Sequence, residues 1–276
     1  MIWLNGGIVS AEAAISANDR GLLLGESVFE TLLVKNQVPQ FWTAHLARLA
    51  ASCTALGLSN PHNAAALRDG VMALFDAEKA RHGEKPRAVL RLTVSGGSGG
   101  RGLVPRAEAK PMVMMQLGDA PPRPDALRLH MSDVLRFAGQ FSAAHKTGQY
   151  VDNIMARRQA LAAQADEAVM ANQHGRLAGA AAGNMFVRFD DRLLTPPVSE
   201  GALPGIIRGA LLEMAMIDGL QIEEAPIDMA RLEKADALYV CNSVNGVVAA
   251  AFVQADAAQK KQGLVLNDAL PEFSSF

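Results

Sequence analysis

The sequence has few residues of the types that mark several large classes of protein. Only two cysteines, Cys53 and Cys241, stand far apart among 276 residues, so we expect neither a disulfide framework nor a cysteine-rich zinc site. The six histidines show no metal-ligand spacing, and we predict no metal. A net charge of -2 and a pI near 6.3 give no strong attraction to nucleic acid or anionic membranes.

Long hydrophobic runs are also missing, although half of the residues are hydrophobic. No run approaches the roughly 18 apolar residues of a membrane span. The first six residues lack the basic and apolar regions of a signal peptide. We therefore expect a cytoplasmic protein that acts on a small molecule, with no nucleic acid and no membrane as partner.

Hydrophobic periodicity predicts a small α/β domain over residues 1–118. The glycine-rich stretch 21–25 is interpreted as a bend, Asn36-Gln37 as a hairpin turn, Thr43 as a helix N-cap and Gly57 as the stop of that helix. We predict strands at 2–9, 27–34, 38–42, 87–94 and 111–117, and helices at 43–57 and 63–81.

Three prolines within residues 121–124 exclude both a helix interior and a central strand, so we place a linker at 119–125. Residues 126–276 form the second, larger domain. Within it we predict strands at 127–131, 167–172, 184–189, 193–195, 221–227, 237–241 and 247–253. The helices expected there span 151–165, 229–234 and a segment that begins at Ile206 and ends at Gly219, and residues 178–183 are interpreted as a loop of small residues.

Lys146 is the first candidate for covalent chemistry. It stands beside Gly148, between a strand-like and a helix-like run. A lysine in a loop is usually a solvated charge, whereas catalysis needs a partly desolvated amine that can form a Schiff base. Arg48, on the flank of its helix, is either a surface residue or a clamp that holds phosphate oxygens with paired hydrogen bonds.

Two further segments suit an anion. Gly205 opens a helix at Ile206, where exposed backbone N–H groups and the positive end of the helix dipole could bind phosphate. Ser243 follows a strand end and offers a hydroxyl. An ordinary helix start and a plain turn are the alternatives. The glycines of residues 95–102 do not form a dinucleotide loop, because no helical pattern follows them. That loop could carry Arg101 toward a carboxylate.

Taken together, these motifs resemble the class IV aminotransferases, which are fold-type IV enzymes dependent on pyridoxal 5'-phosphate (PLP). The matching segments are 19–31, 45–49, Lys146 with Asn153, 184–186, 193–195 and 203–208. The resemblance implies a mixed α/β (α+β) fold of two domains, the larger with a barrel-like sheet. It also implies PLP as cofactor, an amino-acid-like substrate and a homodimer.

The resemblance also assigns roles to residues. Lys146 would carry PLP as a Schiff base and then move the α-proton as general base. Arg48, the amides of Ile206 and Ile207, and the hydroxyl of Ser243 would hold the phosphate. Tyr150 would contact the ring or simply pack. The substrate would meet Phe29, Arg91, Arg101, Val244 and Asn245, with Arg91 or Arg101 on its carboxylate.

One position departs from the family pattern. Gly179 stands where the family has a glutamate, five residues before Asn184, and residues 177–183 contain no acid. That glutamate pairs with the protonated pyridine nitrogen and makes the cofactor an electron sink. The sequence therefore supports PLP binding more strongly than fast transamination.

Residues 99–102 and 241–243 resemble those of aminodeoxychorismate lyases, which release pyruvate and 4-aminobenzoate for folate synthesis. A D-amino-acid or branched-chain amino-acid transaminase is the alternative. The former has a histidine where Leu103 stands, and Gly96 replaces the arginine usual in the family. A PLP-binding member with low turnover is the third reading, because of Gly179.

Overall fold

The computed structural model describes residues 1–12, 15–83, 85–99, 102–105 and 109–253. The chain divides into two compact units. Unit 1 comprises Met1–Pro121 together with Lys146–Gln149. Unit 2 comprises Pro122–His145 and the described residues from Tyr150 onward. The short segment that contains Lys146 thus belongs to unit 1, although the chain on both sides of it belongs to unit 2.

Unit 1 contains a six-stranded antiparallel sheet in the order β2-β1-β6-β5-β3-β4. Asn36 and Gln37, both with positive φ, form the predicted hairpin turn between β3 and β4. The strands are β1 (Ile2–Leu4), β2 (Gly7–Val9), β3 (Ser27–Lys35), β4 (Val38–Pro39), β5 (Arg87–Ser95) and β6 (Met112–Asp119). The helices are α1 (Arg20–Leu24), α2 (Trp42–Leu56) and α3 (Ala64–His82).

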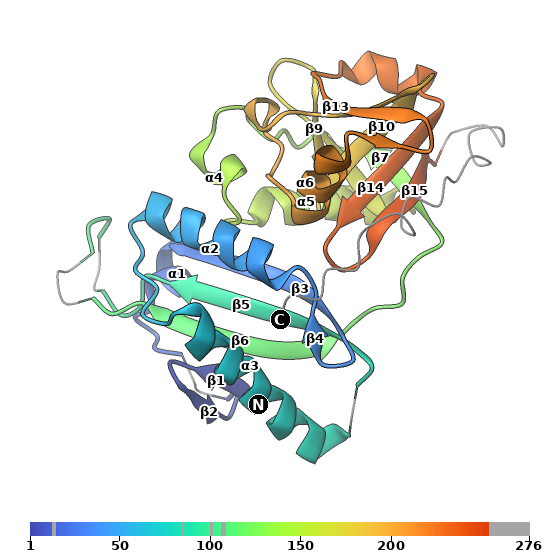
Figure 1. Cartoon of the computed structure of the whole chain (residues 1–276). Coiled ribbons are helices and arrows are strands. Elements are labelled where there is room, and N and C mark those ends of the chain that lie inside the picture. Colours follow the sequence, from blue (N-terminus) through green and yellow to red (C-terminus); the bar gives the residue numbers. More distant parts are fainter. Residues whose placement is uncertain (13–14, 84, 100–101, 106–108, 254–276) are drawn as a thin grey trace. The chain divides into compact units, whose positions relative to one another are not determined.

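Helices α2 and α3 cover one face of this sheet (Figure 1). α2 packs along β3, and α3 packs along β1 and β6. Leu49 of α2 and Leu74 of α3 share one buried cluster with Leu32 and Leu90 of the sheet, which explains the apolar periodicity of both helices. Because strand residues alternate in direction, Glu30 shares the helix-covered face with Leu32, while Phe29 lies on the other face.

Unit 2 contains a nine-stranded mixed sheet in the order β12-β13-β11-β10-β14-β15-β7-β8-β9, which curls into a half-barrel. Its strands are β7 (Ala126–Met131), β8 (Glu167–Ala171), β9 (Leu177–Ala180), β10 (Asn184–Phe189), β11 (Arg192–Thr195), β12 (Met216–Ile217), β13 (Leu220–Glu224), β14 (Ala237–Asn242) and β15 (Gly246–Phe252). Its helices are α4 (Phe141–Ala144), α5 (Val151–Ala162), α6 (Ile206–Met214) and the 3-10 turns η1 (Val198–Glu200) and η2 (Met229–Lys234).

α5 packs against β7 and β8, and α6 packs against β13 and β14. The apolar core of the sheet includes Leu129, Met185 and Val187, which are fully or almost fully buried. In the part of the chain that the structure describes, no helix has both the length and the apolar character needed to cross a membrane.

Two predicted irregular segments are regular elements. Residues 178–183 were predicted to be a loop, but Leu177–Ala180 is strand β9 and pairs antiparallel with β8, so Gly179 lies in a strand opposite Met170. Residues 21–25 were predicted to be a bend, but they lie in α1 and its C-cap. The Asp19 side chain accepts hydrogen bonds from the first N–H groups of α1.

Two helix boundaries also differ from the predictions. The predicted strand 38–42 stops at Pro39, and α2 starts at Trp42 with Phe41 as its N-cap, so Thr43 is inside the helix. The helix that begins at Ile206 ends at Met214 and not at Gly219. Gly219, with positive φ, instead turns the chain between β12 and β13.

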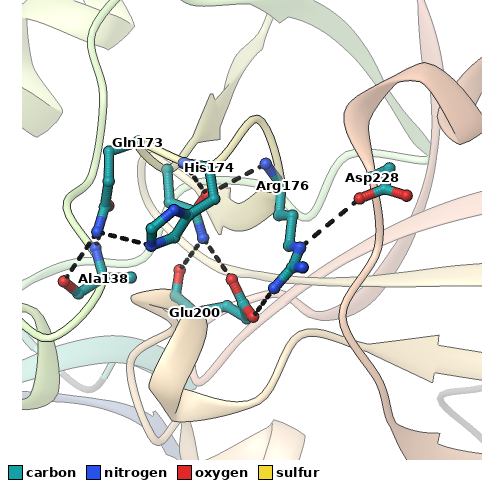
Figure 2. A network of polar contacts seen from close by, with 7 residues as sticks. Ala138, Gln173, His174, Arg176, Glu200 and Asp228 are labelled. Carbon is teal, nitrogen blue, oxygen red and sulfur yellow. Dashed lines mark hydrogen bonds and ion pairs between the residues drawn. The ribbon is translucent and has the colours of Figure 1, made fainter.

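A polar network that includes the buried Asn172 and Glu200 joins the turn between β8 and β9 to η1 (Figure 2). The Nδ2 of Asn172 donates to Glu200 Oε2 at 2.6 Å, and Arg176 Nη1 donates to Glu200 Oε1 at 2.8 Å. Asn172 Oδ1 in turn accepts from the backbone N–H of His174 and Arg176. Since η1 leads into the start of α6, this network fixes the approach to that helix.

Replacing Glu200 with alanine should lower the free energy of unfolding by about 1–3 kcal/mol, because the buried Asn172 amide loses its carboxylate acceptor. Urea unfolding followed by circular dichroism measures the loss. Asp228→Asn is the matched control. The exposed Asp228 lies 3.7 Å from the same Arg176, so its replacement should leave the midpoint unchanged. Equal effects of the two changes would contradict this account.

Both cysteines are free and buried. Burial raises the pKa of Cys53 to about 11 and that of Cys241 to about 12. Because the thiolate is the reactive form, we expect iodoacetamide at pH 8 to leave the folded protein unlabelled. Mass spectrometry should find both thiols alkylated after unfolding in guanidinium. Rapid labelling of the folded protein would show that these thiols are accessible.

Candidate active site

Lys146 is held by pairing of its backbone with the start of β3. Its carbonyl accepts the N–H of Phe29 at 2.9 Å, and the N–H of Gly148 donates to Ser27 O at 2.8 Å. Thr147 forms an antiparallel bridge with Val28 between these two bonds. The lysine therefore stands on a backbone anchored to a buried strand, which is the support that a precise catalytic group requires.

The side chain of Lys146 lies over the ring of Phe29, with Nζ 4.3 Å from the ring centroid. The guanidinium carbon of Arg91 lies 3.7 Å from the same centroid. Thr93 is the direct partner of Phe29 on β5, and among the described residues its buried Oγ1 has no hydrogen-bond partner. Unit 1 thus gathers a lysine, an arginine and a buried hydroxyl around one aromatic ring.

Arg48 binds a carboxylate within unit 1. Its Nε donates to Glu30 Oε1 at 2.8 Å and its Nη2 to Oε2 at 2.5 Å. The Nδ1 of His45 lies 2.6 Å from the same Oε2. Glu30 and His45 are almost completely buried, and Arg48 is 11% exposed, so the three form a buried cluster on the helix-covered face.

The charges of this cluster follow from its burial. Burial alone would raise the pKa of Glu30, but hydrogen bonds from Arg48 and His45 hold that pKa below its ordinary value of 4.5. Burial lowers the pKa of His45, against the effect of Glu30, so His45 is neutral at pH 7 and its Nδ1–H donates to the carboxylate. Within the described residues the buried Nε2 has no hydrogen-bond partner.

The start of α6 fits an anion. Its N-cap, Gly205, supplies no side chain to the first N–H groups, which are those of Ile206 and Ile207. A Cβ at Gly205 would collide with Asn184 Oδ1, so glycine lets Asn184 approach. Asn184 Nδ2 donates to Leu203 O at 2.8 Å and fixes the loop before the helix.

Ser243, Val244 and Asn245 lie in the turn between β14 and β15. Asn242 Oδ1 accepts from the N–H of Val244 at 3.0 Å and of Asn245 at 2.9 Å. Asn242 Nδ2 donates to Ala182 O, so this turn borders the segment that follows β9. In the described part of the chain, the buried Oδ1 of Asn245 lacks a partner. The uncapped helix and the nearby turn with a hydroxyl are consistent with a phosphate-bearing ligand in unit 2, whereas the unpartnered amide oxygen can only accept and suits a donor group.

The other end of the predicted cofactor site differs from the family pattern. Gly179 has φ of 146°, and a Cβ there would stand 3.5 Å from Nη1 of Arg136. Tyr150 is the N-cap of α5 and interacts electrostatically with Arg136. A cation therefore lies beside the position where the family has glutamate.

Arg101 lies outside the described residues, so its contacts stay a prediction. The described residues that follow it are tied to Arg20, which is almost fully buried. Arg20 Nη1 donates to Gly102 O at 2.8 Å and Nη2 to Leu103 O at 3.0 Å, while Nε pairs with Glu26. Within the described ranges, no group of three or more His, Cys, Asp or Glu side chains could hold a metal ion.

Comparison with known proteins identifies the family. The family model for class IV amino-transferases matches residues 27–251, so the chain belongs to this family, as its motifs predicted. These enzymes depend on PLP, which confirms the predicted cofactor, and their fold confirms the predicted architecture.

Individual relatives differ in their activities. A protein of Methanocaldococcus jannaschii named for branched-chain-amino-acid aminotransferase activity is 30% identical, with 90% of this chain and 85% of the relative covered. The aminodeoxychorismate lyase of Vibrio harveyi is 23% identical, with 92% of each covered. The solved 4-amino-4-deoxychorismate lyase of Pseudomonas aeruginosa is 28% identical, with a TM-score of 0.81 and coverage of 98% and 96%.

The sequence motifs assign no role to Glu30, His45 and Arg136. Glu30 and His45 lie inside the recognised segments, and a charged residue at an inward position of β3 is the signal that could have singled out Glu30. Arg136 stands in an irregular stretch before α4 and has no local signal. Arg136 comes close to Gly179 only through the tertiary fold, since the two residues are far apart in the sequence.

Proposed function

We propose that this chain is a PLP-dependent enzyme that acts on an amino-acid-like substrate through Lys146, most closely as an aminodeoxychorismate lyase. The reaction would be an elimination that releases pyruvate and 4-aminobenzoate in the service of folate synthesis. The carrying observation is the anchored Lys146, whose amine lies with Arg91 at the ring of Phe29. When bound, PLP supplies a sink for the electrons left at the substrate α-carbon.

Each residue of the predicted site would then have its own role in binding or proton transfer. Lys146 holds the cofactor and moves the α-proton. Arg91 or Arg101 binds a substrate carboxylate, and Val244 and Asn245 border the substrate. Arg48, the N–H groups of Ile206 and Ile207, and the Ser243 hydroxyl bind the phosphate, while Tyr150 and Gly179 lie toward the ring. Because Arg48 is bound to Glu30, this carboxylate sets the orientation of the guanidinium.

Three observations favour other functions. The 30% identity to the Methanocaldococcus protein supports a branched-chain transaminase, and a D-alanine aminotransferase of Bacillus licheniformis is 25% identical. The lack of a carboxylate at Gly179 supports a PLP-binding member with low turnover.

Three assays on the purified, PLP-loaded protein separate these functions. Pyruvate release from aminodeoxychorismate supports the lyase. Conversion of the cofactor to its aminated form by D- or L-amino acids, without pyruvate release from aminodeoxychorismate, supports a transaminase instead. A yellow protein inactive in both assays supports low turnover, and a colourless protein that ignores added PLP would overturn all three. We further propose that the protein is a cytoplasmic homodimer. Light scattering of the purified protein tests its oligomeric state.

A further inference from the structure

A guanidinium occupies the space next to Gly179. A Cβ built at Gly179 would stand 3.5 Å from Arg136 Nη1 and 3.3 Å from Gly183 O. Arg136 Nη2 donates to Ala180 O at 3.2 Å and contacts Met170 Sδ at 3.6 Å. Within the described residues, the hydrogen bonds of this guanidinium are made by Nη2, so the Nη1 donor beside Gly179 is left for a ligand.

Hydrogen bonds fix the backbone at Arg136 and shortly after it. Its N–H donates to Ala171 O at 2.9 Å. Two residues later, Ala138 exchanges hydrogen bonds with the Gln173 side chain, at 2.8 and 3.3 Å (Figure 2). Gly201, with φ of 94°, packs so closely that a Cβ there would stand 3.1 Å from Arg136 O. The fold of unit 2 therefore holds the backbone of Arg136, and the contacts of Nη2 hold its guanidinium.

We propose that Arg136 presents its guanidinium to the pyridine nitrogen of bound PLP and keeps that nitrogen unprotonated. The inference rests on the proposed binding of PLP, with its nitrogen toward Gly179. A guanidinium can only donate hydrogen bonds, and a neutral pyridine nitrogen can only accept one. A nearby positive charge also disfavours protonation of a base. The cofactor of this chain is then a weaker electron sink than one paired with a carboxylate.

The other charged groups near Arg136 do not supply the missing acid. Glu167 Oε1 accepts from the N–H of Ala168 at 2.8 Å and lies 3.7 Å from Arg157 Nη1, so its carboxylate is already bound. Burial raises the pKa of Glu167. Burial lowers the pKa of Arg136, against the effects of Tyr150 and Glu167, but an arginine side chain keeps its charge in proteins.

Nitrogen-15 NMR of protein loaded with PLP labelled at the pyridine nitrogen tests the proposal. We expect the chemical shift of a neutral pyridine between pH 6 and 8, with free PLP in acid and in alkali as references. Gly179→Glu should move the shift to that of the protonated nitrogen. Gly179→Gln has the same size and the same backbone strain, so it should leave the shift neutral. Glu167→Gln should also leave it neutral.

Arg136 gives an independent comparison. Arg136→Lys keeps a positive charge and should retain the neutral shift, whereas Arg136→Met should raise the pH at which the nitrogen takes up a proton. The step from Gly179→Gln to Gly179→Glu should accelerate α-proton exchange of a bound amino acid by about 10²-fold, because it adds a carboxylate opposite the developing charge.

The outcomes are distinct. A loaded wild-type protein with a protonated nitrogen would overturn this inference and leave the proposed function standing. A neutral nitrogen that does not respond to Gly179→Glu, relative to Gly179→Gln, would overturn the placement of Gly179 at that end of the ring. Failure to load PLP, seen as absence of visible absorbance, would overturn the proposed function and the inference together.

Discussion

Replacing Glu30 with alanine should lower the free energy of unfolding of unit 1 by about 3–5 kcal/mol. The change removes the carboxylate that accepts from the buried Arg48 guanidinium and from the His45 Nδ1–H, and the loss of one partner from a buried ion pair is costly. Both tryptophans of the chain, Trp3 and Trp42, are buried in unit 1, so their fluorescence during urea unfolding reports this unit.

An exposed ion pair in the same unit provides the control. Asp119 pairs with Lys85 at 2.5 Å, but the Asp119 side chain is 84% exposed. Asp119→Asn should therefore leave the unfolding midpoint unchanged. If Glu30→Ala shifts the midpoint no more than this control does, the buried cluster does not stabilise unit 1.

The same cluster sets a pH dependence with a definite sign. The pKa of Glu30 is lowered in the folded protein, so its contribution is complete above about pH 4.5 and is lost as the pH falls through the lowered value. The pKa of His45 is also lowered, so below about pH 6.5 the unfolded chain takes up a proton that the folded chain does not. Both effects reduce stability in acid. The difference between wild type and Glu30→Ala should narrow below pH 4.5.

Local patterns predicted the elements whose residues carry a strong pattern. β3 is mostly buried along its length, and β5 alternates buried and partly buried residues. The predicted bounds of both strands lie within one residue of the observed ends. β9 was mistaken for a loop because Leu177–Ala180 consists mostly of Ala and Gly, which have low strand propensity. Its strand state comes from pairing with β8 and from complete burial. α1 is too short for periodicity, and only the cap at Asp19 could have indicated it.

In the candidate site, too, local sequence patterns predict some features, and tertiary contacts alone produce the others. The N-terminus of α6 could be predicted because Gly205 and the apolar run after it are neighbours in sequence. The anchoring of Lys146 by Ser27 and Phe29 could not, since these residues are distant in the chain and no local pattern links them. The approach of Arg136 to Gly179 has the same origin. The sequence therefore predicts Lys146 as the candidate Schiff-base lysine, and the structure shows that backbone hydrogen bonds to β3 hold this segment.

Replacing Lys146 with alanine should remove covalent attachment of PLP and lower the rate of the reaction by about 10²–10⁴-fold, because the chain loses its positioned proton carrier. Borohydride reduction of the loaded wild-type protein should fix the cofactor on the peptide that contains Lys146, as detected by mass spectrometry. The alanine variant should show no such adduct and no visible absorbance after dialysis.

Two controls separate the role of the amine from that of its charge and from stability. Lys146→Arg keeps a cation near the Phe29 ring, where Nζ now lies 4.3 Å from the centroid, but a guanidinium cannot replace the amine in the covalent bond. It should be as inactive as the alanine variant. The backbone bonds to β3 do not involve the side chain, so both variants should unfold at the wild-type urea midpoint. A reduced adduct on another lysine, with activity retained in Lys146→Ala, would show that a different residue carries the cofactor.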